Sequence, residues 1–344
     1  MKRYFLILSI LVTVTLLAFG QKTDSNALPF GVNLASAEFG HGSPIPGEID
    51  VHYFYPTVED LEYWKSKGLT LIRIPFKWER IQHELNGSLN KDEVSKIKYL
   101  LNEASRLDMK IILDLHNYGR RKVANKARII GEDSLSIENF TNFWGQMAKE
   151  FNGHKAIYGY GLMNEPHDML QTTPWEKIAQ ACIFEIRKYD NKTTVIVGGN
   201  YWSSANRWLE ESNYLKNLYD PSNNTIFEAH VYFDEDGSGV YRRGYDEEKA
   251  HPFIGIERTQ PFVKWLKENK LKGFIGEYGV PADDQRWLVC LDNLLSYLQQ
   301  QGVNGTYWAA GAKWNKYILS VQPSNNYSSD KPQVNVLTKY KTTK

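Results

Sequence analysis

Cysteine is nearly absent from this sequence: the 344-residue chain contains only Cys182 and Cys290. Each cysteine falls on an apolar stripe with the i, i+3, i+4 spacing of a helix, as small buried hydrophobic side chains do. The two predicted helices come fourth and seventh in the alternating pattern described below, so we expect them to lie apart and to form no disulfide. Neither cysteine belongs to a motif with the spacing of a metal or redox site, so such a role has no support.

An excess of charge of either sign is also absent. Lys and Arg number 41 against 40 Asp and Glu, which gives a formal net charge of +1. Proteins that bind nucleic acids usually carry a marked basic surplus, so we expect no nucleic-acid partner. A composition of 42% hydrophobic and 24% charged residues is typical of a folded protein and argues against disorder. The 10 Trp and 21 Tyr residues are many for this length, and aromatic faces in a cleft commonly hold uncharged sugars.

Long apolar runs are limited to the start of the chain. Lys2 and Arg3 precede a run at 5–19 that only three hydroxyl side chains interrupt, and small residues follow it. This order predicts a signal peptide at 1–20. The run is shorter than the roughly 20 residues of a membrane-spanning helix, so an uncleaved anchor is the less favoured alternative. We therefore expect a secreted or periplasmic protein of residues 21–344, without stable membrane insertion after cleavage.

Short apolar runs of strand length recur eight times, and a longer amphipathic stretch follows most of them. The runs are Phe30–Leu34, Thr70–Pro75, Lys110–Leu115, Ile157–Met163, Thr194–Gly198, Thr225–Val231, Lys272–Gly276 and Gly305–Ala309. Nearly continuous apolar strands are typical of parallel strands buried on both faces. Eight alternating strand and helix units, about 39 residues apart on average, predict an α/β fold of the (β/α)8 TIM barrel type.

Two features of other architectures are missing. An open doubly wound sheet normally carries a Gly-rich phosphate turn after an early strand, and none follows these strands. No linker rich in Pro, Ser or Gly divides the chain, although its length would allow two domains. We therefore predict that residues 21–344 form one barrel domain.

Polar residues cluster where six of the predicted strands end. Active sites of such barrels lie at the carboxyl ends of the strands, so these side chains are candidates for chemistry. The candidates, in chain order, are Arg73, His116, Asn164, Glu165, His230, Tyr232, Glu277 and Trp308.

Two glutamates among them suggest a reaction. Glu165 and Glu277 follow the fourth and seventh strands, whose ends face each other across the mouth of an eight-stranded barrel. A glycosidic bond is cleaved with retention when an acid and a carboxylate nucleophile lie about 5–5.5 Å apart, and with inversion at about 6.5–9.5 Å. Both outcomes remain open at this point. Arg73 would favour the ionised form of Glu277, whereas Glu165 must keep its proton near neutral pH to act as an acid.

Several motifs occur along nearly the whole chain after the predicted signal peptide. In chain order they are GVNL at 31–34, LIRIPF at 71–76, DLHNY at 114–118, NEPH at 164–167, HVYFDEDGSG at 230–239, FIGEYGVP at 274–281 and WAAG at 308–311. In this combination the chain resembles glycoside hydrolase family 5, the retaining cellulase-type barrels. In detail it resembles the endo-β-1,4-glucanase branch shared by fungi and bacteria.

The resemblance implies that Glu165 is the acid/base and Glu277 the nucleophile. It also implies a substrate-binding shell on the non-reducing side of the cleaved bond, made of Arg73, His116, Asn164, His230, Tyr232 and Trp308. The implied protein is a secreted, monomeric endo-β-1,4-glucanase that acts on β-1,4-glucan without a metal or other cofactor. One position departs from the family pattern: Lys313 stands before Trp314, where the family leads us to expect an aromatic side chain that stacks on sugar.

Other interpretations remain open at the level of sequence. His116 and His230 are also typical of hydrogen-bonded core histidines, and Asp114 is more typical of a buried hydrogen-bonding residue than of a third catalytic acid. For Trp202, a position lining the cleft and a position in the core are about equally favoured. The same mechanism could act on another β-glycan, as in a mannanase, a xyloglucanase or an exo-acting β-glucosidase. A non-catalytic glycan-binding protein is a more distant alternative, because both glutamates are present.

Overall fold

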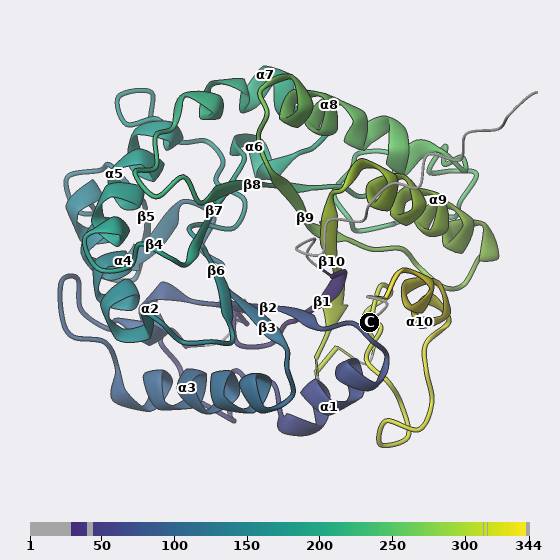
Figure 1. Ribbon diagram of the computed structural model, residues 1–344, viewed down its shortest axis with the longest axis horizontal. Helices are drawn as coiled ribbons and strands as arrows, with labels where there is room; N and C mark the ends of the chain where they lie inside the picture. Colours follow the sequence, from purple (N-terminus) through teal and green to yellow (C-terminus); the bar gives the residue numbers. More distant parts are fainter. Residues whose placement is uncertain (1–28, 40–43, 312, 315, 342–344) are drawn as a thin grey trace, which may run out of the picture.

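Eight parallel strands close into a barrel (Figure 1) in the computed structural model, which describes residues 29–39, 44–311, 313–314 and 316–341. The predicted signal peptide at 1–20 lies outside the described residues. Around the barrel the strand order is β1-β10-β9-β8-β7-β6-β3-β2. The strands are β1 (Gly31–Leu34), β2 (Leu71–Phe76), β3 (Lys110–Leu115), β6 (Ile157–Gly161), β7 (Thr194–Gly198), β8 (Thr225–His230), β9 (Gly273–Tyr278) and β10 (Asn304–Ala310). The predicted (β/α)8 barrel is confirmed.

The barrel interior has an apolar layer and a charged layer. Alternate residues of a strand point to the same face. A separate buried cluster consists of Leu71, Ile112, Ile196, Ile226 and Phe274, one residue from each of five strands. Two positions further along three of these strands come Arg73, Asp114 and Glu228, all buried. The apolar layer therefore closes the amino end of the barrel, and the charged layer lies beneath its mouth.

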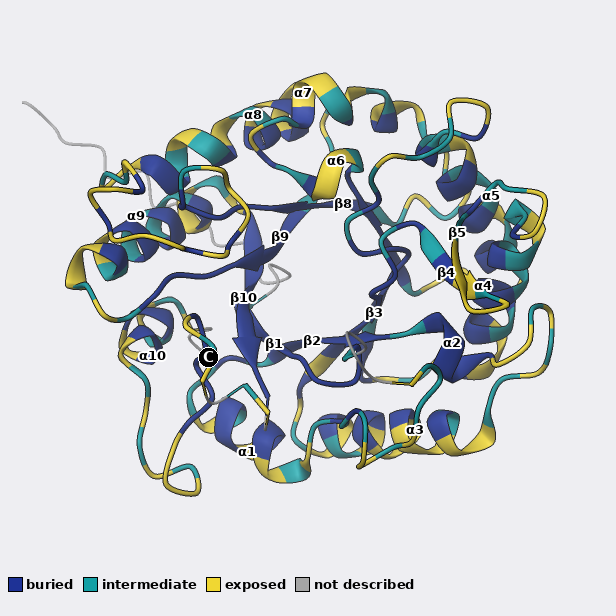
Figure 2. Ribbon diagram, turned by 180° about the vertical axis from the view of Figure 1, so that it is seen from behind, coloured by how far each residue is buried: buried dark blue, intermediate teal, exposed yellow. Residues whose placement is uncertain are grey.

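Helices surround the strands and turn their buried faces toward them (Figure 2). The longer helices are α1 (Val58–Ser66), α3 (Lys91–Arg106), α4 (Ile137–Phe151), α5 (Trp175–Arg187), α8 (Ile254–Glu268) and α9 (Gln285–Gln301). The sequence pattern did not predict α8, because polar residues and Pro261 separate its apolar positions. Short helices α6 (Asn200–Ser203) and α7 (Trp208–Glu211) replace a long helix between β7 and β8.

Two further short helices follow strands of the barrel. They are α2 (Trp78–Ile81), directly after β2, and α10 (Pro332–Leu337), after β10. The cysteines lie in α5 and α9, and both are buried and free, as predicted. In the described part of the chain no helix combines the length and the apolar character needed to cross a membrane.

A hairpin after β3 was not predicted from the sequence. Strands β4 (Arg120–Val123) and β5 (Lys126–Ile129) pair antiparallel outside the barrel. Five of their eight residues are Lys or Arg, so the segment lacks the apolar run of a buried strand. The guanidinium of Arg120 donates to the carbonyl oxygens of Tyr118 and His167, which anchors the hairpin beside the barrel mouth.

Candidate active site

All eight candidate residues lie together at the mouth of the barrel. Hydrogen bonds and ion pairs join seven of them into one network, and Trp308 joins through a ring stack on His116. The network crosses the barrel from β2 to β10. Residues separated by more than 200 positions in the chain therefore form a single cluster.

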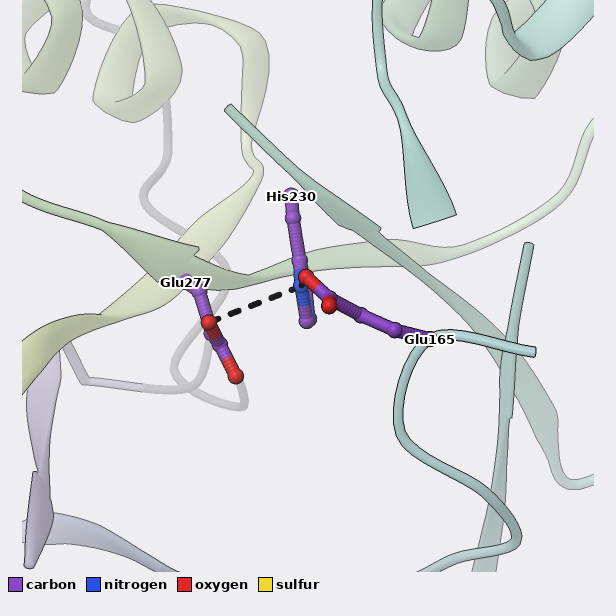
Figure 3. A group of neighbouring side chains, drawn as sticks. All are labelled: Glu165, His230 and Glu277. Carbon is purple, nitrogen blue, oxygen red and sulfur yellow. Dashed lines mark hydrogen bonds and ion pairs between the residues drawn. The ribbon is translucent and has the colours of Figure 1, made fainter. Parts of the chain in front are cut away.

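The two glutamates face each other with His230 between them (Figure 3). One carboxylate oxygen of Glu165, one of Glu277 and a ring nitrogen of His230 all lie within 4.8 Å of one another. His230 Nδ1 lies 2.7 Å from Oε1 of Glu165 and 3.7 Å from Oε2 of Glu277. In the described part of the chain no other group of His, Cys, Asp and Glu has the spacing of a metal site.

Glu277 is buried and receives two further donors. The hydroxyl of Tyr232 donates to Oε2 at 2.8 Å, and Nη1 of Arg73 donates to Oε1 at 3.2 Å. Burial raises the pKa of Glu277, while His230, Arg73 and the Tyr232 hydroxyl oppose that rise because they favour its ionised form. The contact expected between Arg73 and Glu277 is present, but burial and the nearby Glu165 together outweigh its effect on the pKa of Glu277.

Arg73 is the central cation of the site and is fully buried. Its Nη2 lies 2.9 Å from both Asp114 and Glu228, and its Nη1 also donates to the Asn33 side chain at 2.9 Å. Burial opposes the charge of the guanidinium, but the carboxylates outweigh that effect and raise the pKa of Arg73. The side chain therefore stays charged and balances the anions around it.

His116 is a neutral counterpart to His230. Its Nδ1 lies 2.9 Å from Oδ2 of Asp114, and its Nε2 lies 3.3 Å from the amide nitrogen of Asn164. Burial, together with the nearby cations Lys77 and Arg73, lowers the pKa of His116 well below its usual value. The hydrogen-bond network thus assigns the proton to Nδ1, which donates to Asp114, and leaves Nε2 to accept from Asn164. Asp114 is a buried hydrogen-bonding residue, as the sequence suggested.

Trp308 lies against His116 with a ring separation of 5.3 Å and an interplanar angle of 8°. Trp314 meets the edge of Trp308 at 5.7 Å, and its indole nitrogen donates to the carbonyl of Ala35. The neighbouring Lys313 is exposed and places its ammonium 4.3 Å from the ring centre of Phe54. This part of the wall therefore has a cation where the family pattern suggested an aromatic ring.

A pocket of about 520 Å³ opens beside Glu165, and Trp308 is not among its lining residues. Three of the candidate residues, Glu165, His230 and Tyr232, line it. The other lining residues come from three segments. They are Tyr201, Trp202, Ser204, Asn206 and Arg207 after β7; Val231, Glu235, Asp236, Gly237 and Ser238 after β8; and Arg258 of α8. Trp202 is 40% exposed and stacks on His167 at 4.3 Å, so it lines the cleft rather than the core.

Sequence reasoning missed Asn33 and Glu228. Both contact Arg73. Glu228 stands two positions before His230 on the same strand, and this spacing places both side chains on one face. This spacing of two residues was the signal in the sequence that could have identified Glu228 as a further carboxylate in the site. Asn33 is the last but one residue of β1. No candidate site residue lies two positions from it on that strand, so the sequence offered no such signal.

Comparisons with known proteins agree with this geometry. The model of the cellulase family, glycosyl hydrolase family 5, matches residues 40–314. Endo-beta-1,4-glucanase B of Emericella nidulans is 32% identical over 300 residues, which are 86% of each chain. The structure of Pseudomonas stutzeri endoglucanase Cel5A in complex with cellobiose superposes with a TM-score of 0.85 at 38% identity, covering 91% of this chain and 92% of that one.

A structure of XacCel5A in complex with cellopentaose is similar to the same degree. Its TM-score is 0.82 at 38% identity, with coverage of 90% of this chain and 98% of that one. The relatives thus include both fungal and bacterial glucanases. The family model covers more than half of the chain, and the barrel carries the family's motifs at its mouth. The protein therefore belongs to the cellulase family, glycosyl hydrolase family 5.

Proposed function

We propose that the protein is a secreted endo-β-1,4-glucanase that cleaves internal glucosidic bonds with retention of configuration. The observation that carries the mechanism is the approach of Glu165 and Glu277 to within 4.8 Å. Carboxylate oxygens that approach this closely favour the short spacing of retaining enzymes over the wider one that admits the water of an inverting reaction.

The reaction proceeds in two displacements. The carboxylate of Glu277 attacks the anomeric carbon while Glu165 gives its proton to the leaving glycosidic oxygen. The C–O bond to the leaving sugar breaks, and a covalent glycosyl-enzyme ester forms on Glu277. Glu165, now a carboxylate, takes a proton from water as the water oxygen attacks the same carbon. The ester bond breaks, Glu277 is restored, and the sugar leaves with its original configuration.

The surrounding residues prepare Glu277 for attack. Arg73 and the Tyr232 hydroxyl each donate to one of its oxygens, which favours the ionised carboxylate and fixes its orientation. Asn164 donates toward His116 through one amide hydrogen and keeps a second one for a sugar 2-hydroxyl. We assign Trp308 to the wall beside the non-reducing sugar.

The pocket beside Glu165 fits the leaving sugar. Glu165 lines this pocket and Glu277 does not, so it adjoins the proposed acid/base, and Trp202 gives it an exposed aromatic face. The relatives crystallised with cellobiose and cellopentaose support a β-1,4-glucan as substrate. The predicted signal peptide at 1–20 supports secretion, and we propose that the protein acts as a monomer without a cofactor.

Product release from four polysaccharides tests this proposal. The substrates are carboxymethylcellulose, mixed-linkage β-glucan, xyloglucan and mannan, each offered to the wild type, Glu165→Ala and Glu277→Gln. We expect activity on the first two and a loss of more than about 10³-fold in both variants. Proton NMR of the first product should show the β-anomer before mutarotation. Activity confined to xyloglucan or mannan would refute the substrate, an initial α-anomer would refute retention, and binding without products would favour a glycan-binding protein.

A further inference from the structure

A third glutamate lies beneath the catalytic pair, and the proposed reaction does not use it. Glu228 belongs to β8, and only 2% of its surface is exposed. Its Oε1 lies 3.1 Å from Nε2 of His230 and 2.9 Å from Nη2 of Arg73. Burying a carboxylate this deeply costs free energy unless positive charges pair with it and donors hydrogen-bond to it.

The carboxylates that face His230 favour protons on both of its ring nitrogens. A neutral imidazole has one N–H, and its other nitrogen carries a lone pair. Here Nε2 faces Glu228, while Nδ1 faces Glu165 at 2.7 Å and Glu277 at 3.7 Å. In the proposed mechanism Glu165 holds its proton before the reaction, so the ionised carboxylates at the two ends of the ring are Glu228 at Nε2 and Glu277 at Nδ1. Only the imidazolium offers an N–H to both of them.

The neighbouring strand leaves room for the Glu228 carboxylate. Gly276 lies in β9, where the pairing with β8 shifts register between Ala229 and His230. A Cβ atom built on Gly276 would overlap Oε1 of Glu228 and lie only 2.6 Å from its carboxyl carbon. Such a distance is shorter than real side chains tolerate, so glycine at this position is a requirement of the buried carboxylate.

The charges around His230 come from several strands. Glu228 lies on the same strand as His230, Glu277 on β9 and Glu165 in the loop after β6. Arg73 on β2 and Asp114 on β3 complete the layer. Burial alone would lower the pKa of His230, but the carboxylates of Glu277, Glu165 and Glu228 outweigh it and raise the value to about 10.

We propose that Glu228 is a positioning residue that keeps His230 protonated on both nitrogens and holds its Nδ1–H between Glu165 and Glu277. This role rests on the proposed function of the two glutamates. During the first displacement Glu165 gains negative charge as its proton leaves, and Glu277 loses its charge as the ester forms. A fixed Nδ1–H can support whichever carboxylate is charged, without a change in the position of the ring.

Nitrogen NMR of histidine-labelled protein tests the protonation directly. The signals of His230, one of eight histidines, are identified by their loss in His230→Gln. In the wild type we expect both ring nitrogens to stay protonated from pH 5 to 8. In Glu228→Gln, which removes the charge and keeps the shape, we expect His230 to titrate within this range. Glu228→Asp keeps the charge and should restore most of the wild-type behaviour.

Glu93→Gln is the matched control. Glu93 is also 2% exposed, but it lies in α3 and accepts from the hydroxyls of Tyr53 and Tyr55. The control should leave the His230 signals unchanged. A wild-type His230 that is neutral at pH 8, or a Glu228→Gln protein with wild-type signals, would overturn the proposal. If Glu228→Gln does not fold, the wild-type and Glu228→Asp spectra still decide the matter.

The pH profile of kcat/KM tests whether the effect of Glu228 on His230 matters for catalysis. Because the loss of a nearby negative charge makes proton release easier, the alkaline limb should move to lower pH by about one unit or more in Glu228→Gln. A purely structural role would lower activity equally at all pH values. Expected NMR results in a protein that hydrolyses no β-glycan would refute the proposed function and leave the protonation of His230 standing.

Discussion

Nη1 of Arg73 lies 3.2 Å from Oε1 of Glu277, although 204 residues separate them in the chain. The two residues belong to β2 and β9, with β1 and β10 between these strands in the barrel. The contact therefore crosses the barrel interior. It connects the proposed nucleophile to a side chain that also contacts Asp114 and Glu228.

Arg73→Met should reduce both stability and activity. The change removes the buried guanidinium that pairs with Asp114, Glu228 and Glu277, so we expect a loss of about 3–5 kcal/mol in the free energy of unfolding. Urea denaturation followed by tryptophan fluorescence measures this loss. Arg242→Met is the control, because Arg242 forms an exposed ion pair with Asp236 and should change stability by less than about 1 kcal/mol. Similar losses in the two variants would contradict the central role of Arg73.

Tyr232→Phe should shift the acid limb of the pH profile. The hydroxyl of Tyr232 donates to Glu277 and lowers the pKa of that group. Without this donor the pKa of Glu277 rises, so the acid limb of kcat/KM should move to higher pH. We also expect kcat/KM at the optimum to fall by about 10- to 100-fold. Tyr63→Phe removes a hydrogen bond to Asp330 far from the mouth and should leave the profile unchanged, whereas an unshifted limb in Tyr232→Phe would refute the assignment.

Gly276→Ala should damage the site through Glu228. The added methyl group would overlap the Glu228 carboxylate, so this side chain must move away from His230 and Arg73. We expect activity to fall by more than about tenfold and unfolding free energy by about 1–3 kcal/mol. Gly244→Ala is the control, since its nearest neighbour, an oxygen of Glu247, lies 3.9 Å from the added atom. A Gly276→Ala protein with wild-type activity would contradict the requirement for space.

Trp202→Ala should affect long substrates more than short ones. Trp202 lines the pocket assigned to the leaving sugar, so its loss should raise KM for cellopentaose about tenfold. An aryl cellobioside, which places no sugar in that pocket, should keep its KM. Steady-state kinetics on both substrates measure the difference. Tyr219→Ala removes an aromatic ring that is 64% exposed outside the pocket and serves as control. Equal effects on both substrates would place the leaving sugar elsewhere.

Most of the barrel could be predicted because its signals are local. Apolar runs of strand length and helical periodicity reflect burial that neighbouring residues share. The runs at Lys110–Leu115 and Thr194–Gly198 coincide with β3 and β7. The hairpin β4–β5 escaped this reasoning because its strands are basic and lie outside the core. Its position is set by anchoring contacts such as those of Arg120, which no periodicity reveals.

The sequence predicted which eight residues gather at the mouth, but only part of the geometry between them. The eight candidates do meet at the mouth, because the carboxyl ends of parallel strands must converge there. Glu228 was overlooked, although its spacing from His230 places both side chains on one face. The different protonation of the two histidines follows from partners on other strands: Asp114 and Asn164 for His116, and three carboxylates for His230.

The sequence by itself determined the fold class, the order of the strands along the chain and the residue types at the mouth. These follow from side-chain chemistry and from periodicities of two and 3.6 residues, which act over short stretches of chain. Only the tertiary structure decided that Glu165 and Glu277 approach within 4.8 Å and that Glu228 lies beneath His230. Such distances depend on how the barrel closes, how its strands register and where Gly276 leaves space, because electrostatic interactions and catalysis change over about an ångström.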